Sequence, residues 1–206
     1  MNADIAECKA HLRRELRARC LAVFDPARVE LSRLACALLR GRSEWTRARR
    51  ILFYHPLRDE LDLRPALREA LSLGKEVALP RYRAGEGNYE AALIGNEERD
   101  LRPGWAGIPE PAASCPPIPL NQLDLVLVPG VGFDCDGRRL GRGKGFYDRL
   151  LAAVRGVRCG VACEWQVVGQ VPTQPHDERV DCILTPTRWI DCRLRARSEH
   201  EFHGGD

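Results

Sequence analysis

A continuous apolar run at residues 123–133, LDLVLVPGVGF, is the feature that most constrains the fold. A strand without polar alternation is buried on both faces, which is typical of the interior of a parallel sheet. Parallel neighbours are joined by crossovers, usually helices, and other segments of the chain fit this pattern. The strand candidates are 50–57, 156–164 and a part of 180–190, and the helix candidates are 62–73 and 145–155. The chain therefore predicts an α/β sandwich with helices packed on a mostly parallel sheet.

The N-terminal part of the chain predicts two helices. Apolar side chains recur every three or four residues between 4 and 24, the spacing of an amphipathic helix. The apolar positions are Ile5, Cys8, Leu12, Leu16, Cys20 and Val23, and the polar face carries Glu7, Lys9, Arg13 and Arg17. A second helix is expected from Pro26 to about Gly41. We expect a single domain over 1–206, with a helical segment 1–45 packed outside an α/β core 46–192, and a C-terminal tail 193–206.

Two further segments carry turn signals. Residues 76–82 and 89–94 are strand candidates joined by the glycine-containing turn RAGEGN, so a hairpin is expected. Residues 99–120 contain six prolines and are predicted to be an extended loop.

Composition narrows the class of protein. The 206 residues carry a formal net charge of +3, which is too small to indicate a nucleic-acid-binding protein. The nine cysteines form no CxxC pair, and several lie in apolar segments, so reduced core thiols are expected. The charged N-terminus lacks the apolar stretch of a signal peptide, and no segment is long enough to span a membrane. We expect a cytoplasmic monomer that acts on small molecules, without a nucleic-acid or membrane partner.

Residues 137–148, GRRLGRGKGFYD, are the strongest candidate for a ligand-binding loop. Gly141, Gly143 and Gly145 allow close approach of the backbone to a ligand. Four cations lie within seven residues, at Arg138, Arg139, Arg142 and Lys144. Only three of the 32 basic residues of the chain are lysines, so Lys144 favours a position that needs a compact ammonium. Crowded cations are explained by an anion such as a triphosphate.

Asp148 follows this loop and would repel a phosphate chain directly. A divalent cation that bridges carboxylate and phosphate oxygens removes the conflict, and magnesium usually has this role. Asp181 is a candidate for a second carboxylate ligand. The alternative is a solvated turn in which Asp148 compensates Arg149 or the helix dipole.

Two known phosphate-binding motifs were compared with the loop. Walker A fails, because Gly145 and not Ser or Thr follows Lys144. A dinucleotide fingerprint fits better, with Glu164 nearly twenty residues on, although residues 134–140 separate the glycines from their strand. A nicotinamide-dependent oxidoreductase therefore remains an alternative. A second alternative is RNA binding, since the first fifty residues hold twelve Lys and Arg against six Asp and Glu, but aromatic residues are only 6% of the chain.

The segment 127–151, LVPGVGFDCDGRRLGRGKGFYDRLL, resembles the signature of the 5-formyltetrahydrofolate cyclo-ligase family. Shorter motifs agree in order: KAHLR, DELDL, LPRY, GIPEP and VPTQPHDERVDCILTPT. The resemblance covers about residues 9–188. It implies a three-layer α/β/α sandwich, Rossmann-like, and conversion of 5-formyltetrahydrofolate and ATP to 5,10-methenyltetrahydrofolate, ADP and phosphate with Mg²⁺.

The resemblance also implies roles for individual residues. The ATP-binding positions would be Lys9, Arg13, Arg138, Arg139, Leu140, Gly141, Arg142, Gly143, Lys144, Gly145, Phe146 and Tyr147. The substrate-binding positions would be His55, Glu60, Trp105, Gly143, Phe146 and Tyr147. The catalytic positions would be Lys144, Arg139, Arg142 and Tyr147, and the metal-linked carboxylates would be Asp148 and Asp181. In this scheme ATP phosphorylates the formyl oxygen before N10 closes the ring.

Two positions carry alternatives. The family's usual Gly-Tyr-Tyr-Asp is Gly-Phe-Tyr-Asp here, so Phe146 lacks the hydroxyl of the first tyrosine. Glu60 is expected to face the pterin, but an acid that stabilises the start of the helix at 62–73 is an equally good interpretation from the residues alone.

Overall fold

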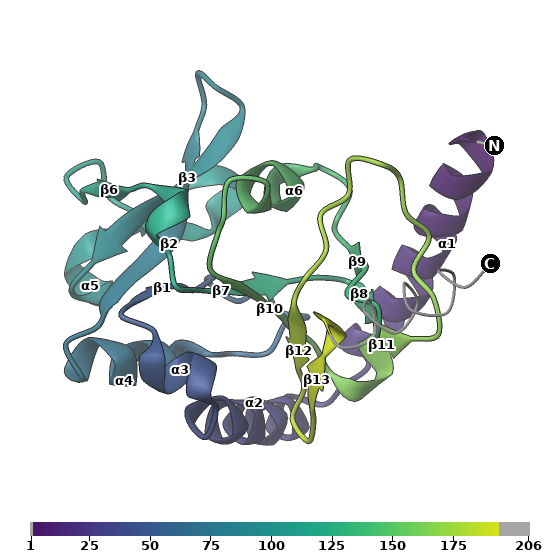
Figure 1. The fold of residues 1–206 in the computed structure, drawn as a ribbon, viewed down its shortest axis with the longest axis horizontal. Coiled ribbons are helices and arrows are strands. Elements are labelled where there is room, and N and C mark those ends of the chain that lie inside the picture. Colours follow the sequence, from purple (N-terminus) through teal and green to yellow (C-terminus); the bar gives the residue numbers. More distant parts are fainter. Residues whose placement is uncertain (1, 194–206) are drawn as a thin grey trace, which may run out of the picture.

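The computed structural model describes residues 2–193, so nearly all of the predicted C-terminal tail lies outside the described residues (Figure 1). The main strands are β1 (Arg50–Leu52), β2 (Glu76–Arg83), β3 (Asn88–Ile94), β6 (Pro117–Ile118), β7 (Leu125–Pro129), β10 (Val157–Val161), β12 (Cys182–Leu184) and β13 (Trp189–Asp191). In this part of the chain they form one eight-stranded sheet in the order β13-β12-β10-β7-β1-β2-β3-β6. The five strands from β12 to β2 are parallel, whereas the pairs β12–β13, β2–β3 and β3–β6 are antiparallel, and β13 and β6 form the edges of the sheet. The predicted mostly parallel α/β sheet is confirmed.

The apolar run at 123–133 supplies the central strand β7. Its residues Leu125, Val126, Leu127 and Val128 are all 0% exposed, as expected for a strand covered on both faces. The strand is shorter than the run, because it ends at Pro129 and the chain bends at Val131. The following residues form β8 (Gly132–Asp134), which joins β9 (Arg139–Leu140) and β11 (Val167–Val168) in a separate three-stranded sheet.

Helices cover both faces of the large sheet (Figure 1). One layer contains α2 (Asp25–Arg40), α3 (Ser43–Arg47) and α4 (Arg64–Ser72), which share a core cluster with Ile51 and Leu127 of the sheet. The other layer contains α6 (Phe146–Leu151), whose Leu150 and Leu151 pack with Val126. The three-layer arrangement predicted from the resemblance is confirmed.

The first helix, α1 (Asn2–Leu21), lies at one end of the molecule beside the three-stranded sheet (Figure 1). Leu16 packs there against Val131 and Leu140. The predicted face of this helix was partly wrong: Cys8 is exposed, whereas Lys9 is only 6% exposed. Lys9 tolerates burial because its ammonium lies 2.5 Å from a carboxylate oxygen of Asp177.

The prediction of an extended loop at 99–120 is wrong. The segment contains α5 (Glu97–Asp100), β4 (Leu101–Pro103), η1 (Trp105–Gly107), β5 (Pro109–Pro111) and η2 (Leu120–Gln122), in addition to β6. Strands β4 and β5 form an antiparallel ribbon, where prolines are tolerated because an outward-facing edge needs no N–H donor. The buried carboxylate of Glu110 fixes this ribbon, since it accepts hydrogen bonds from the backbone N–H groups of Tyr82 at 2.9 Å and Trp105 at 3.2 Å.

The predicted hairpin and the predicted reduced cysteines agree with the structure. Strands β2 and β3 form the predicted hairpin, and a short helix η3 (Glu164–Gln166) follows β10. All nine cysteines are unpaired thiols, and seven of them are buried. None of the helices within residues 2–193 has the length and apolar character required to cross a membrane.

Tight packing between β10 and β8 gives a test of the core. A Cβ added to Gly160 would lie 2.6 Å from a ring carbon of Phe133, whose side chain is fully buried. We expect Gly160→Ala to lower the free energy of unfolding by about 1–3 kcal/mol, measured by urea denaturation. Gly169→Ala is the matched control, because its Cβ would meet nothing within 4 Å. Equal stability of the two variants would contradict this description of the core.

Candidate active site

The order of the parallel strands, β2-β1-β7-β10-β12, reverses between β1 and β7. In doubly wound α/β proteins, ligands bind outside the carboxyl ends of the strands at such a reversal. The residues that follow these two strands, Tyr54 and His55 after β1 and Gly130 after β7, line a pocket that encloses about 160 Å³. A cavity of this size has room for an aromatic ring.

The glycine loop forms one wall of the pocket. Gly143 and Gly145 have φ values of 97° and 66°, which favour glycine because other residues are strained there. Gly141, Arg142, Lys144 and Gly145 all line the pocket. The helix that follows, α6, has only six residues and is shorter than the predicted helix at 145–155.

Two of the four loop cations are held near the small sheet. Arg138 pairs with Asp136 at 2.5 Å and with Asp134 at 3.3 Å, and it does not line the pocket. Arg139 does line the pocket, and its side chain is 3% exposed. Its Nη2 donates to Asp148 at 2.7 Å, while its buried Nε has no hydrogen-bond partner among the described residues.

The other two loop cations lie on the pocket side. Arg142 donates to Asp59 at 2.6 Å and to Glu60 at 2.9 Å. The ammonium of Lys144 has no ion pair or hydrogen bond within residues 2–193. Internal carboxylates therefore account for much of the cation crowding that the sequence attributed to a ligand. Lys144 is the loop cation that stays uncompensated in this part of the chain.

Helix α1 contributes two predicted residues to this region. Nε of Arg13 donates to the backbone oxygen of Gly141 at 2.8 Å, so the helix contacts the glycine loop directly. Burial lowers the pKa of Arg13, and Asp177 and Asp148 oppose this shift. Lys9 lies on the same helix, nearer its N-terminus than Arg13. It pairs with Asp177 and does not line the pocket.

The two predicted metal-linked carboxylates are not brought together. Asp148 lines the pocket. Asp181 directly precedes β12 and therefore lies at the amino edge of the parallel strands, opposite the pocket, where it accepts the backbone N–H of Arg158 at 2.7 Å. The predicted pairing of Asp181 with Asp148 therefore does not agree with the structure, because Asp181 comes directly before β12, at the end of the parallel strands away from the pocket.

The pocket residues are still compatible with a magnesium ion that binds together with the phosphates of a nucleotide. No group of three or more His, Cys, Asp or Glu side chains suited to a metal ion occurs in the described residues. Magnesium, however, is commonly held by one or two carboxylates together with substrate phosphates. Asp148 uses Oδ1 for Arg139, so its second oxygen is the available ligand.

An aromatic cluster borders the pocket, and its members Tyr89, Trp105 and Phe146 line it. The rings of Tyr82, Tyr89, Trp105 and Phe146 contact one another with centroids 5.1–5.6 Å apart. Trp105 is 38% exposed. Sequence analysis missed Tyr82 and Tyr89, although both lie in the predicted hairpin, where they are directly opposite each other. Burial raises the pKa of Tyr89 to about 12, so its hydroxyl is neutral at physiological pH.

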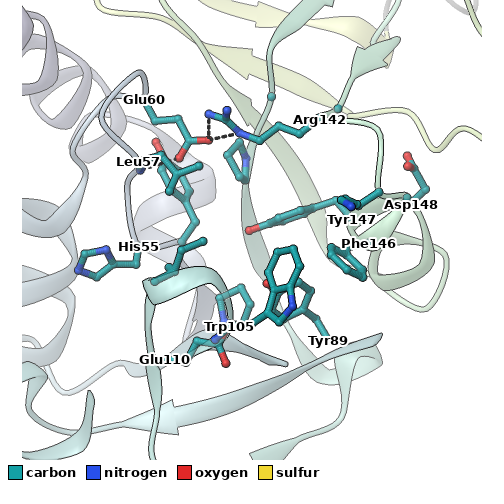
Figure 2. A pocket seen from close by; sticks show the side chains of 18 of the residues that line it. His55, Leu57, Glu60, Tyr89, Trp105, Glu110, Arg142, Phe146, Tyr147 and Asp148 are labelled. Carbon is teal, nitrogen blue, oxygen red and sulfur yellow. Dashed lines mark hydrogen bonds and ion pairs between the residues drawn. The ribbon is translucent and has the colours of Figure 1, made fainter. Parts of the chain in front are cut away.

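Glu60 and Tyr147 face each other across the pocket (Figure 2). Glu60 accepts the backbone N–H of Leu57 at 2.9 Å, and burial raises its pKa while Arg142 opposes the shift. Helix α4 begins only at Arg64, so Glu60 is not the acid at its start. The ring of Tyr147 reaches between the Arg142–Glu60 pair and the aromatic cluster (Figure 2). Burial, and next the charge of Glu60, raise the pKa of Tyr147, so its hydroxyl stays a proton donor.

His55 lies beside these groups at the end of β1. Burial, and next the charge of Arg64, lower its pKa, so the imidazole is neutral at physiological pH. The pocket thus combines an aromatic wall, a buried carboxylate and a cationic loop. Such a set of groups recognises a planar heteroaromatic ligand that has hydrogen-bond donors, next to an anion.

Fold and site together define a doubly wound α/β protein with a cationic glycine loop and an aromatic-lined pocket at the strand-order reversal. Comparison with known proteins gives the family. The model of the 5-formyltetrahydrofolate cyclo-ligase family matches residues 5–186, and the chain belongs to this family. Neither the nicotinamide oxidoreductase nor the RNA-binding alternative is supported by this membership.

Individual relatives agree over most of the chain. A 5-formyltetrahydrofolate cyclo-ligase of Mus musculus is 30% identical over 87% of this chain and 94% of its own length. The structure of a 5,10-methenyltetrahydrofolate synthetase of Aquifex aeolicus is similar with a TM-score of 0.81 and 31% identity, over 90% of this chain and 93% of that one. A Mycoplasma pneumoniae structure, 22% identical with a TM-score of 0.70 over 86% of this chain and 98% of that one, shares the fold.

The Arg139–Asp148 pair gives a stability test. Asp148→Asn would leave the guanidinium of Arg139 buried without a countercharge, so we expect the free energy of unfolding to fall by about 3 kcal/mol in urea denaturation. Glu76→Gln is the control, because it breaks an ion pair with Arg50 whose side chains are 41% and 49% exposed. That change should cost at most about 1 kcal/mol. A loss at Asp148 no larger than the loss at Glu76 would show that Arg139 is not buried as described.

Proposed function

We propose that this chain converts 5-formyltetrahydrofolate and ATP to 5,10-methenyltetrahydrofolate, ADP and phosphate in the presence of Mg²⁺. Family membership supports this reaction, and the names of the relatives are those of this enzyme. The observation that carries the proposal is the pocket at the β1/β7 reversal, where Glu60 faces an aromatic wall and the uncompensated Lys144 lies on the glycine loop.

The chemistry explains the need for ATP. The formyl group is amide-like, so direct ring closure by N10 would have to expel hydroxide, a poor leaving group. The formyl oxygen instead attacks the γ-phosphorus, and the bond to the β–γ bridging oxygen breaks to release ADP. N10 then attacks the activated carbon and loses its proton, and the C–O bond breaks to release phosphate. Phosphoryl transfer of this kind requires alignment and charge neutralisation more than a covalent intermediate on the protein.

The cationic side of the pocket suits the phosphates. Lys144 neutralises the transferring oxygens, and Arg139 and Arg142 contribute their unused donors. Arg13 and the backbone from Leu140 to Gly145 complete the nucleotide site. Asp148 would hold Mg²⁺ together with the phosphates, and the ion neutralises phosphate charge.

The aromatic side of the pocket suits the folate. Glu60 accepts hydrogen bonds from the donor-rich pyrimidine edge of the pterin, and Trp105 and Phe146 provide the apolar wall. The Tyr147 hydroxyl is a neutral donor for the formyl oxygen. Because Phe146 packs within an aromatic cluster, its missing hydroxyl does not alter this wall. His55 borders the same end of the pocket.

We also propose that the chain acts on these small molecules as a cytoplasmic monomer, and its small net charge of +3 favours the absence of a nucleic-acid partner.

The reaction is tested by mixing the purified chain with 5-formyltetrahydrofolate and MgATP. The near-ultraviolet absorbance of the methenyl product should rise, and omission of ATP or Mg²⁺ should abolish the rise. A chain that reduces or oxidises folates with NAD(P) and forms no methenyl product with MgATP would refute the proposal.

Lys144 gives the sharpest test of the mechanism. Loss of a preorganised donor to the transition state typically costs roughly a hundred- to a thousandfold in rate, so we expect Lys144→Ala to lose kcat by this factor in the same assay. Its urea denaturation curve should be unchanged, because the ammonium has no partner in the described residues. Lys144→Arg should also be impaired, since a planar guanidinium replaces a compact ammonium. Normal turnover of the alanine variant would remove Lys144 from the mechanism.

A further inference from the structure

Arg142 depends on another segment of the chain for its orientation. It lies between Gly141 and Gly143, and Gly143 has φ of 97°, so the local backbone has wide conformational freedom. Its side chain is 30% exposed, and its ion-pair partners are Asp59 and Glu60. These two carboxylates therefore set the direction in which the guanidinium presents its donors.

Asp59 contacts Arg142 from outside the pocket. Its Oδ1 accepts from Nη2 of Arg142 at 2.6 Å, and its Oδ2 lies 3.7 Å from Nε of Arg17 on helix α1. The Asp59 side chain is 9% exposed and does not line the pocket, whereas Arg142 and Glu60 both do. Asp59 therefore reaches a ligand mainly through Arg142, to which it is hydrogen-bonded, while its charge also acts on the neighbouring Glu60.

Glu60 competes for the same guanidinium. Its Oε1 accepts from Nη2 at 2.9 Å and from Nε at 3.3 Å, and its Oε2 accepts the backbone N–H of Leu57. Without Asp59, Glu60 would be the remaining carboxylate partner of Arg142 in the described chain. The guanidinium of Arg142 would then pair with both carboxylate oxygens of Glu60. This pairing would occupy the lone pairs of Glu60 that a ligand needs.

We propose that Asp59 is a positioning residue for substrate recognition. By holding Nη2, it divides Arg142 between two carboxylates and leaves Oε2 of Glu60, which accepts the backbone N–H of Leu57, a lone pair for a hydrogen bond from the pterin. The inference rests on the proposed function, because it assigns Glu60 to the pyrimidine edge of the folate. It adds a residue that lies outside the pocket and links helix α1, the turn at 57–60 and the glycine loop.

The test is a double-mutant cycle on folate affinity. Asp59→Asn keeps the size of the side chain and removes its charge, and we expect the Kd for 5-formyltetrahydrofolate, measured by tryptophan fluorescence, to rise roughly tenfold. In an Arg142→Gln background the same change should alter Kd by less than about twofold, because Asp59 acts through Arg142. An unchanged Kd in the single variant, or an equal effect in both backgrounds, would overturn the proposal.

Controls separate positioning from folding. Asp62→Asn removes a carboxylate of the same segment that pairs with Arg64 and does not line the pocket, so its Kd should equal that of the wild type. If Asp59→Asn fails to fold, Arg142→Lys tests the same contact from the other side. It keeps the charge but lacks the planar fork of donors with which the guanidinium spans Asp59 and Glu60, so a comparable rise in Kd is expected and an unchanged Kd contradicts the proposal.

Binding and turnover are read separately. A wild-type chain that binds 5-formyltetrahydrofolate but forms no methenyl product with MgATP would refute the proposed reaction, and the cycle on Kd would still test Asp59. A wild-type chain that does not bind the folate would refute both.

Discussion

The reversal of strand order between β1 and β7 is the constraint on which the rest of the site depends. Because β2 and β7 lie on opposite sides of β1, the connections that leave β1 and β7 diverge, and a pocket opens above their carboxyl ends. The turn at 57–60 is placed on one side of this opening and the glycine loop on the other. Every contact between the carboxylates of the first and the cations of the second follows from that placement.

Charge compensation within the chain then determines which cations a ligand meets. Arg139 is buried against Asp148, and Arg142 is shared by Asp59 and Glu60, so these guanidinium groups are held in place before any ligand arrives. Groups that are positioned in advance do not have to reorganise during reaction, which is the main source of electrostatic catalysis. Lys144 differs, because no carboxylate within the described residues reduces its charge.

The errors of the sequence analysis share one physical origin. Proline content indicated a loop at 99–120, but Glu110 ties this segment to the hairpin as a two-stranded ribbon. Polar character placed Lys9 on the solvent side of α1, but Asp177, 168 residues away, allows its burial. The family motif alone suggested that Asp181 and Asp148 bind the same metal ion, although they lie at opposite ends of the parallel strands. In each case a partner distant in sequence overrides the local preference.

The sequence by itself determined the central buried strand, the alternation of strands and helices, the hairpin, and the glycine loop with its lysine, because these depend on apolar periodicity and on residues next to one another in the chain. The resemblance to the family added Glu60, Arg13 and Trp105, all of which the structure places at or beside the pocket. Only the tertiary structure decided the strand order, the aromatic cluster with Tyr82 and Tyr89, and the sharing of Arg142 between Asp59 and Glu60. These depend on contacts between segments about 20 to 80 residues apart, and hydrophobic pattern carries no information on which distant side chains will meet.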